Sequence, residues 1–463
     1  MADVDNAQAI VVQRSNKACF AVLLFTIDQP EGAKTFLRTW TPQTPAGWAP
    51  EPTGGAALYF LFSWSGLEKL LAGRRDFNVD DGRRAFETFF VDPTQAPDNP
   101  AMARQLGFIG RSSPDGWWHQ FQTGSIELVV YGAFDDPAHR DDQVRRLRSA
   151  AASCGLTELR LPSFPGGSLA GYRPPGGRLH FGYRDGITTP DIDWSDSRRP
   201  GGVNLREVIT GYPSDDYPTA PFQPGPWRDF SREGSYGCLT WISQDVGRFE
   251  AYLEEKAATV APLARGADPK EWLAARLLGR WREGTALGLH GEERPEPADL
   301  GDNFGYADDP AGLKCPLTAH IRVVNSRDQP LKFANRIRFP NGPPRLVRRG
   351  FSYGAPWTGP GGADEDRGVV GLFFCARVNE QFYTILRWIH RTDFSDVLTA
   401  LPRGLDAQDA LIADRSDPTS NTTIHLAAGG RAVDVGLATF LSYRGVSILF
   451  APGKQALATL GND

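Results

Sequence analysis

The sequence lacks the features of a membrane-spanning, secreted or disulfide-bonded protein. Its 463 residues contain no apolar run of about 18 residues, so we expect no transmembrane helix. The N-terminal stretch MADVDNAQAIVVQRSNK has neither the apolar segment of a secretory signal nor a twin-arginine pair, which predicts a cytoplasmic location. The five cysteines are odd in number, widely scattered and form no CxxC, so neither a disulfide framework nor a zinc site is expected.

An excess of either charge is missing too. The 50 Lys and Arg and the 55 Asp and Glu leave a net charge of −5, which gives no indication of a nucleic-acid or membrane-surface partner. What the chain does have is length and apolar content. Its 463 residues, 41% of them hydrophobic, are enough for two or three domains with cores of their own. The 50 Gly and 36 Pro predict long connections between the elements.

Segments with strand spacing alternate with segments of helical spacing in both halves of the chain. A stretch rich in Pro, Gly and Asp, from about 188 to 227, separates the halves and is expected to be a linker or a long surface excursion. The alternation predicts a duplicated α+β sandwich whose strands can pair antiparallel. We expect strands at 18–27, 56–65, 125–134, 234–243, 368–378 and 445–452, and helices at 31–40, 66–73, 139–155, 244–257, 271–281 and 379–391.

The seven histidines show no metal-ligand spacing, since none forms HxH or HExxH. This disfavours a cage of several His ligands but leaves open a cofactor that needs one, and haem is the main such cofactor. His320, in CPLTAHIRVVNSRDQP, is our candidate. Taken alone such a His is more often a satisfied core or surface residue, but Arg322 and Arg327 follow it closely. Arginine suits the two carboxylates of haem because it is always charged and forms forked hydrogen bonds.

Two more segments carry residues that peroxide chemistry needs. FGYRDGITTP sets Asp185 between two glycines, which by itself indicates a turn. RLVRRGFSYG, at 345–354, holds three arginines near aromatics and glycines, and alone it predicts a solvated basic strand or an anion site. Cleavage of a metal-bound peroxide needs a group that moves a proton between the oxygens and a positive charge beside the departing hydroxide. Asp185 can carry the proton, Arg348 can supply the charge, and His320 can hold the metal from the opposite face.

In order along the chain, these segments resemble the motifs of the dye-decolourising peroxidases. FGYRDG matches the GxxDG motif of that family, CPLTAHIRVVNSRD is similar to its segment with the haem-ligating His, and RRGFSYG to its distal Arg segment. The resemblance covers most of the chain from about position 180 onward, and the earlier part more loosely. Further segments that match in order are GSYGCLTWISQDVGRFEAYL, LLGRWREGTAL, FGYADDPAG, RGVVGLFFCARVNEQF and FLSYRGVSILFAPGKQAL.

The resemblance implies a fold, a cofactor and an activity. The fold is α+β, with two ferredoxin-like domains of antiparallel sheets, which we place at 1–205, with the GxxDG motif, and at 206–463, with the haem-binding segment. The cofactor is one haem b per chain. The activity is that of a peroxidase, which reduces hydrogen peroxide and oxidises a bulky aromatic, phenolic or dye-like donor. Assembly into a homo-oligomer is possible and is not decided by the sequence.

The resemblance also assigns roles to single residues. His320 stands at the position of the axial ligand, Asp185 at the acidic position of GxxDG, and Arg348 at the distal Arg. Arg327 matches an Arg associated with the haem carboxylates, and Arg322 is a helper beside it. An acid behind the axial His would raise its basicity. Three further candidates complete the set: Leu372 and Phe374 as the apolar roof of the distal pocket, and Asp393, in RTDFSD, as the acid behind His320.

Several alternatives remain at the level of the sequence. Val323, Val324 and Ser326 depart from the commoner residues of the family next to the ligand, which puts substrate access in doubt more than catalysis. His180 is the second candidate for the axial ligand, and the neighbours of Arg348 within 345–349 are the alternative cations. A haem-binding or haem-handling protein with incidental peroxidase activity, and a two-domain binding protein without haem, are the competing functions.

Overall fold

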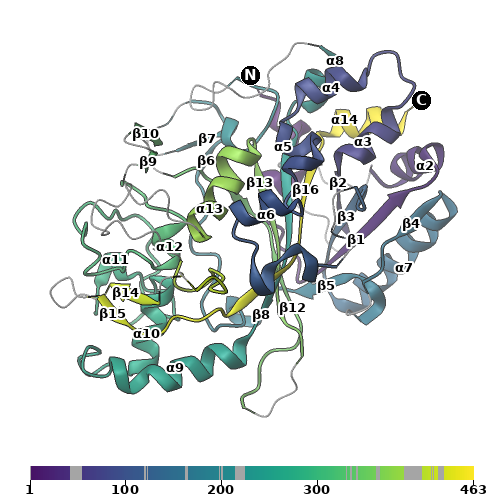
Figure 1. Cartoon of the computed structure of the whole chain (residues 1–463). Coiled ribbons are helices and arrows are strands. Elements are labelled where there is room, and N and C mark those ends of the chain that lie inside the picture. The colour runs from purple at the N-terminus through teal and green to yellow at the C-terminus, as the bar shows by residue number, and fades with distance from the viewer. Residues whose placement is uncertain are drawn as a thin grey trace.

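A ten-stranded antiparallel sheet forms the centre of the fold (Figure 1). The computed structural model describes residues 2–462 apart from 42–54, 119–120, 122–123, 162–164, 198, 200–201, 214–224, 330, 334–335, 340–342, 361–364, 391–408, 419, 421 and 426–431. The strands of the central sheet are β1 (Cys19–Ile27), β2 (Ala57–Phe62), β3 (Leu128–Phe134), β4 (Leu156–Glu158), β5 (Leu169–Tyr172), β8 (Ser235–Gln244), β11 (Val347–Arg348), β12 (Phe351–Tyr353), β13 (Gly368–Cys375) and β16 (Leu441–Ala451).

Helices and three small strand pairs surround the sheet. The pairs are β6 (Ile192–Asp193) with β7 (Val203–Asn204), β9 (Leu331–Phe333) with β10 (Arg336–Phe339), and β14 (Thr423–His425) with β15 (Ala432–Asp434). The helices are α1 (Ala9–Val12), α2 (Pro30–Trp40), α3 (Trp64–Leu71), α4 (Val79–Ala85), α5 (Thr88–Val91), α6 (Pro100–Gln105), α7 (Pro137–Ser153), α8 (Pro226–Ser231), α9 (Val246–Val260), α10 (Pro269–Leu278), α11 (Leu287–His290), α12 (His320–Val323), α13 (Thr384–His390) and α14 (Lys454–Gly461). Over the described part of the chain, no helix has the length and apolar content to cross a membrane.

Four of the five sheet strands in each half of the chain are arranged in the same order. In the first half the order is β4-β1-β3-β2, with α2 after β1 and α7 after β3. In the second half it is β16-β8-β13-β12, with α9 after β8 and α13 after β13. This repetition confirms the expected α+β class with two ferredoxin-like, antiparallel units. The division at residue 205 stays a prediction.

The two units join at both edges, so the sheet closes on itself. Phe62 of β2 pairs with Phe450 of β16, and Tyr172 of β5 pairs with Ser352 of β12. Because side chains alternate along a strand, one face of every strand points to the inside of this closed sheet. Buried side chains from all the main strands meet there, among them Val22, Tyr131, Leu239, Trp241, Val370, Leu372, Phe374 and Leu449.

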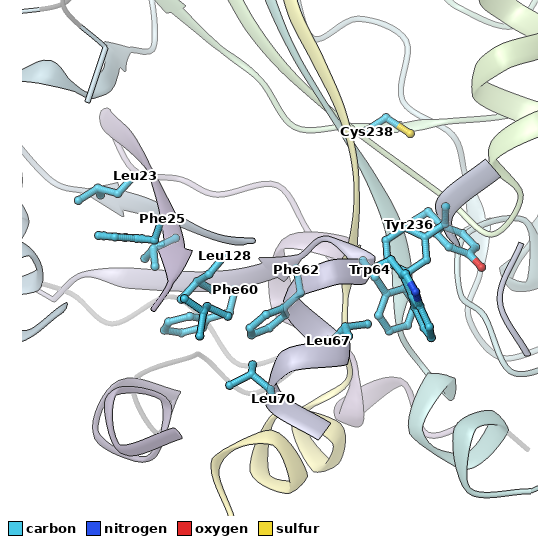
Figure 2. Close-up of a cluster of buried hydrophobic side chains, with 14 of the residues drawn as sticks. Leu23, Phe25, Phe60, Phe62, Trp64, Leu67, Leu70, Leu128, Tyr236 and Cys238 are labelled. Atoms are coloured by element: carbon cyan, nitrogen blue, oxygen red, sulfur yellow. The ribbon is translucent and has the colours of Figure 1, made fainter. Parts of the chain in front are cut away.

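The outer face of the sheet carries helices. Figure 2 shows Phe60, Phe62 and Leu128 of the first unit against Leu67 and Leu70 of α3. Ser63 caps α3, since its side chain accepts a hydrogen bond from the backbone N–H of Gly66. In Figure 1, α2, α3 and α7 lie on one side of the molecule, and α9, α10 and α11 lie on the other.

Helices α9 and α10 build a separate core that receives the segment just before Asp185. The Phe181 ring lies 4.7 Å from that of Phe249, and the Tyr183 hydroxyl donates to the carbonyl of Ala274 over 2.7 Å. The FGYRDG segment, which comes from the first half of the chain, is therefore held by the helices of the second half. This places Asp185 at the meeting of the two halves.

Most of the expected strands and helices are present, and the differences have physical reasons. The segment expected as one helix over 379–391 is a π-helix (Val378–Tyr383) that continues as α13. The expected linker, 188–227, contains β6, β7 and the start of α8. Trp227 and Phe230 of α8 pack in the outer-face core, so the end of this stretch is part of the folded protein.

Candidate functional site

His320 begins the short helix α12, and its ring is fixed by a carboxylate. Nδ1 of His320 lies 2.7 Å from Oδ2 of Asp409, whose side chain is fully buried. The other oxygen of Asp409 accepts the backbone N–H groups of Leu411 and Ile412, each over 2.9 Å. A carboxylate held in this way accepts the Nδ1 proton, which leaves the lone pair of Nε2 as the metal-binding position. The His320 side chain is 22% exposed.

Among the described residues, Asp409 is the acid that contacts the ring of His320, where the sequence predicts Asp393. Asp393 lies outside the described residues. Asp409 lies 89 positions after His320, and no spacing or motif in the sequence connects them. The pairing of these two residues depends on a tertiary contact. The N–H of Ala410 donates to the carbonyl of Thr318 over 2.8 Å, which brings the two segments together.

Asp185 lies in a turn that two glycines make possible. Gly182 and Gly186 have φ of 83° and 79°, a conformation that other residues rarely adopt. The N–H of Asp185 donates to the carbonyl of Gly177 over 2.8 Å. Its carboxylate is 34% exposed and lies 3.3 Å from Nη2 of Arg14. The residue is thus both part of a turn and available to a ligand.

Arg348, at the end of β11, reaches the same loop. Its Nη2 donates to the carbonyl of Thr188 over 2.9 Å, and the residue is exposed. Thr188 follows Asp185 by three positions, so the predicted cation contacts the loop that holds the predicted carboxylate. The neighbouring Arg349 is buried and donates to the carbonyls of Ile10 and Val11, so it has other partners.

Leu372 and Phe374 lie on the other face of their strand from Arg348. Residues directly opposite in an antiparallel pair have their side chains on one face of the sheet. Arg348 is opposite Phe373, and Val347 is opposite Phe374. Leu372 and Phe374 both belong to the inner core, and their role as the roof of the distal pocket stays a prediction. The partly exposed Phe373 is the residue on the face of Arg348.

Arg327 is bound to Asp302, which also binds the loop of Asp185. Nη1 of Arg327 donates to the carbonyl of Asp302 over 2.6 Å, and its Nη2 to Oδ1 over 2.5 Å. The same Oδ1 accepts the Thr188 hydroxyl over 3.0 Å and Nη2 of Arg280 over 2.8 Å. Nε of Arg327 is buried without a hydrogen-bond partner among the described atoms. This donor can serve an anionic group of a ligand.

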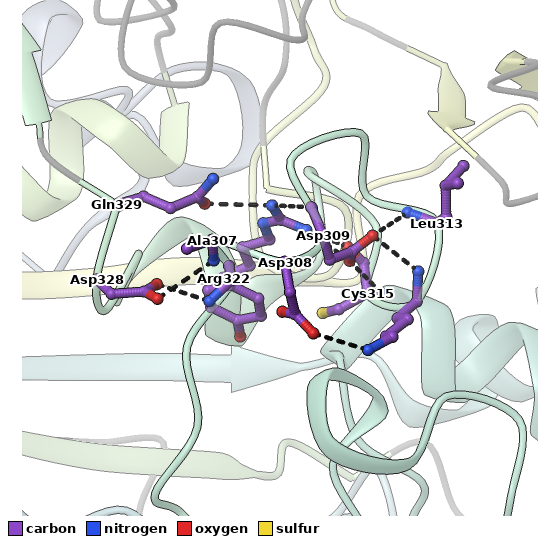
Figure 3. A network of polar contacts seen from close by, with 10 residues as sticks. Ala307, Asp308, Asp309, Leu313, Cys315, Arg322, Asp328 and Gln329 are labelled. Atoms are coloured by element: carbon purple, nitrogen blue, oxygen red, sulfur yellow. Dashed lines mark hydrogen bonds and ion pairs between the residues drawn. The ribbon is translucent and has the colours of Figure 1, made fainter.

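Arg322 belongs to a closed polar network (Figure 3). Its side chain is fully buried, and Nη1 donates to Oδ2 of Asp309 over 3.0 Å and to the carbonyl of Cys315 over 2.6 Å. Nη2 donates to the carbonyl of Asp309 over 2.7 Å. These bonds hold the loop that leads into α12, so Arg322 supports His320 from within the protein.

The alternative ligand and cations have partners of their own. Nε2 of His180 lies 2.8 Å from the carbonyl oxygen of Tyr353, and burial lowers the pKa of this His. Burial also lowers the pKa of Arg345, which lies near Glu207. Among the described residues there is no cluster of three or more His, Cys, Asp or Glu that could hold a metal ion.

Sequence comparison finds peroxidases. The chain is 24% identical over 325 residues to the dye-decolorizing peroxidase msp1 of Mycetinis scorodonius, covering 63% of this chain and 59% of that protein. It is 25% identical over 370 residues to AauDyP1 of Auricularia auricula-judae, covering 75% and 68%. A bacterial relative, the multifunctional dye peroxidase DyP2 of an Amycolatopsis species, is 28% identical over 256 residues, covering 49% of each chain. No family model matches the sequence.

Structure comparison gives the same family of folds. A fungal DyP-type peroxidase from Auricularia auricula-judae superposes with a TM-score of 0.78 at 23% identity, over 100% of both chains. A dye-decolorizing peroxidase in complex with 2,6-dimethoxyphenol gives 0.76 at 21% identity, again over 100% of both. The chain spans 59% to 68% of the length of the first two curated relatives. In sequence and in fold, the chain is similar to dye-decolourising peroxidases.

Proposed function

We propose that this chain is a haem-dependent peroxidase that reduces hydrogen peroxide and oxidises aromatic, phenolic or dye-like donors. The observation that carries the proposal is the His320–Asp409 pair, with 2.7 Å between Nδ1 and Oδ2. A carboxylate behind an axial His makes the imidazole a stronger ligand and fixes its orientation. The relatives named above support the choice of reaction.

The proposed cofactor is one haem b per chain. Nε2 of His320 would hold the iron, and Arg327 would offer its unpartnered Nε to a carboxylate of the haem. Haem iron supplies the redox chemistry that converts peroxide to water at the expense of the donor. Arg322 and Asp309 would keep α12 in place, since they fix the loop before it.

Asp185 and Arg348 would handle the proton and the charge of the peroxide. Asp185, as a carboxylate, takes the proton from one peroxide oxygen and returns it to the other, which then leaves as water. Arg348 lies beside the same loop and lowers the cost of negative charge on the departing oxygen. In the whole reaction, one hydrogen peroxide, two protons and two electrons from donor molecules give two waters.

The absorption spectrum of the purified, haem-supplemented protein tests the cofactor. We expect a Soret band in the parent, and loss or weak retention of haem in His320→Ala. The matched control is His139→Ala, a half-buried His on α7 whose ring packs against Phe134. Full haem with an unchanged Soret band in His320→Ala would contradict this ligand, and His180 would then be tested next. The pyridine adduct of the extracted haem identifies haem b.

A haem-handling protein with incidental activity is the second candidate. The approach of Arg348 to the loop of Asp185 favours the enzyme, because carrying haem does not need a cation on the loop that holds a proton-transferring carboxylate. Steady-state oxidation of 2,6-dimethoxyphenol with hydrogen peroxide separates the two. The enzyme is supported if the parent shows sustained turnover and Arg348→Leu abolishes it. The control Arg145→Leu, a change on the exposed face of α7, should leave turnover intact. The cytoplasmic location and a homo-oligomer stay predictions.

A further inference from the structure

The N-terminal segment 8–14 is built into the centre of the fold. Nε2 of Gln8 donates to the carbonyls of Phe60 and Pro452, over 2.8 and 3.0 Å, and its Oε1 accepts the N–H of Phe60 over 2.9 Å. Gln8 is buried, as are all four residues of α1. The segment thus contacts strands of both units and has a fixed position.

Arg349 fastens this segment to the strand that carries Arg348. Its Nε donates to the carbonyl of Ile10 over 2.7 Å and its Nη2 to that of Val11 over 3.3 Å. Its Nη1 donates to the carbonyl of Arg348 over 3.0 Å. The last carbonyls of a helix lack partners within the helix and favour a cation, so Arg349 satisfies the C-terminal end of α1.

Arg14, the last residue of this segment, lies two positions after the end of α1, and its side chain contacts Asp185. Nη2 of Arg14 lies 3.3 Å from Oδ2 of Asp185. A Cβ atom at Gly186 would lie 2.5 Å from Nη1 of Arg14, and Gly186 has φ of 79°. The second glycine of the GxxDG motif therefore permits the turn, and the guanidinium of Arg14 lies close to it.

We propose that Arg14 is a positioning residue for Asp185 and that segment 8–14 is part of the distal side of the site. The loop 185–188 is then held at both ends, by Arg14 at the carboxylate of Asp185 and by Arg348 at the carbonyl of Thr188. Both arginines are tied to one another through Arg349 and α1. The catalytic part of this inference rests on the proposed function.

The test uses Arg14→Ala and Arg14→Lys in the full haem-loaded protein, each also combined with Asp185→Asn. An ion pair this exposed contributes little to stability, so the variants are expected to fold. Arg14→Ala should slow the reaction with hydrogen peroxide roughly ten- to hundredfold, because a misplaced catalytic group loses that much. Arg14→Lys should restore part of the rate. In the Asp185→Asn background, Arg14→Ala should have no further effect.

A second measurement needs neither haem nor turnover. Amide hydrogen exchange over 177–190 should become faster in Arg14→Ala than in the parent, whereas Arg145→Ala on α7 should leave it unchanged. A parent-like peroxide rate in Arg14→Ala, or an equal slowing of the Asp185→Asn background, would overturn the catalytic part. Unchanged exchange would overturn the positioning itself. If the parent binds haem but lacks turnover, the proposed function fails, and the exchange result still decides whether Arg14 holds the loop.

Discussion

Nδ1 of His320 lies 2.7 Å from Oδ2 of Asp409, although 89 positions separate the two residues. Asp409→Asn keeps the shape and removes the charge behind the ring. The imidazole becomes a weaker donor to iron, so we expect haem to be retained with a higher Fe(III)/Fe(II) potential. Spectroelectrochemistry measures this. His290 and Asp299 form a second pair at 2.7 Å with no proposed role, so Asp299→Asn is the control, and an equal potential in all three proteins would contradict the account.

Asp302 connects Arg327, which is proposed to bind a carboxylate of the haem, to the loop of Asp185. Its Oδ1 accepts bonds from Thr188, Arg280 and Arg327. Asp302→Asn should lower the free energy of unfolding by about 1–3 kcal/mol, because charged hydrogen bonds to two largely buried arginines lose their acceptor charge. Haem affinity should fall as well. Urea unfolding and haem titration measure both, with the exposed Asp308→Asn as the control; parent-like values would remove Asp302 from the site.

Substitutions at two adjacent residues of β13 test which face of this strand lines the proposed site. Leu372→Ala removes an inner-core side chain and should cost about 2–5 kcal/mol of unfolding free energy, with an unchanged Soret band. Phe373→Ala, on the face of Arg348, should cost less and alter the spectrum or the peroxide rate. The reverse pattern would return Leu372 and Phe374 to the roof of the pocket.

His390 should make stability depend on pH in the acidic range. Burial lowers its pKa to about 4 in the folded protein, against about 6.5 for an unfolded chain. Below 6.5 the unfolded chain takes up a proton that the folded protein does not, so stability falls as the pH drops from about 6.5 to 4. The loss is of the order of 3 kcal/mol. Urea unfolding at pH 7 and 4.5 should show that His390→Gln loses less unfolding free energy between the two pH values than the parent does. The same loss in His390→Gln as in the parent would contradict this. His139→Gln is the control.

Local sequence patterns predicted the helices and strands, whereas the contacts within the candidate site depend on the tertiary structure. Strand β1 and helix α7 follow from apolar spacing and a capping residue, because those signals lie within the element itself. The turn at Asp185 follows from its two glycines in the same way. Two facts depend on register and tertiary pairing: Phe373, not Leu372, shares the face of Arg348, and Asp409 lies behind His320. A single sequence contains no local signal for either.

Arg14 illustrates the same limit. In the sequence it is one basic residue in a stretch that predicts no site, 171 positions before Asp185. Its place follows from Arg349 and Gln8, which hold α1 against strands from both units. The interpretation of Asp185, by contrast, came from a motif, and its catalytic role stays a prediction.

The most direct test of the central claim is the reaction of the haem-loaded protein with one equivalent of hydrogen peroxide, followed by stopped-flow absorption. The parent should react fast. Asp185→Asn keeps the turn and removes the base, so it should react roughly 10²–10⁴-fold more slowly while remaining folded and fully loaded. If the variant reacted as fast as the parent, Asp185 would be a turn residue alone, and the proposed peroxidase site would be wrong.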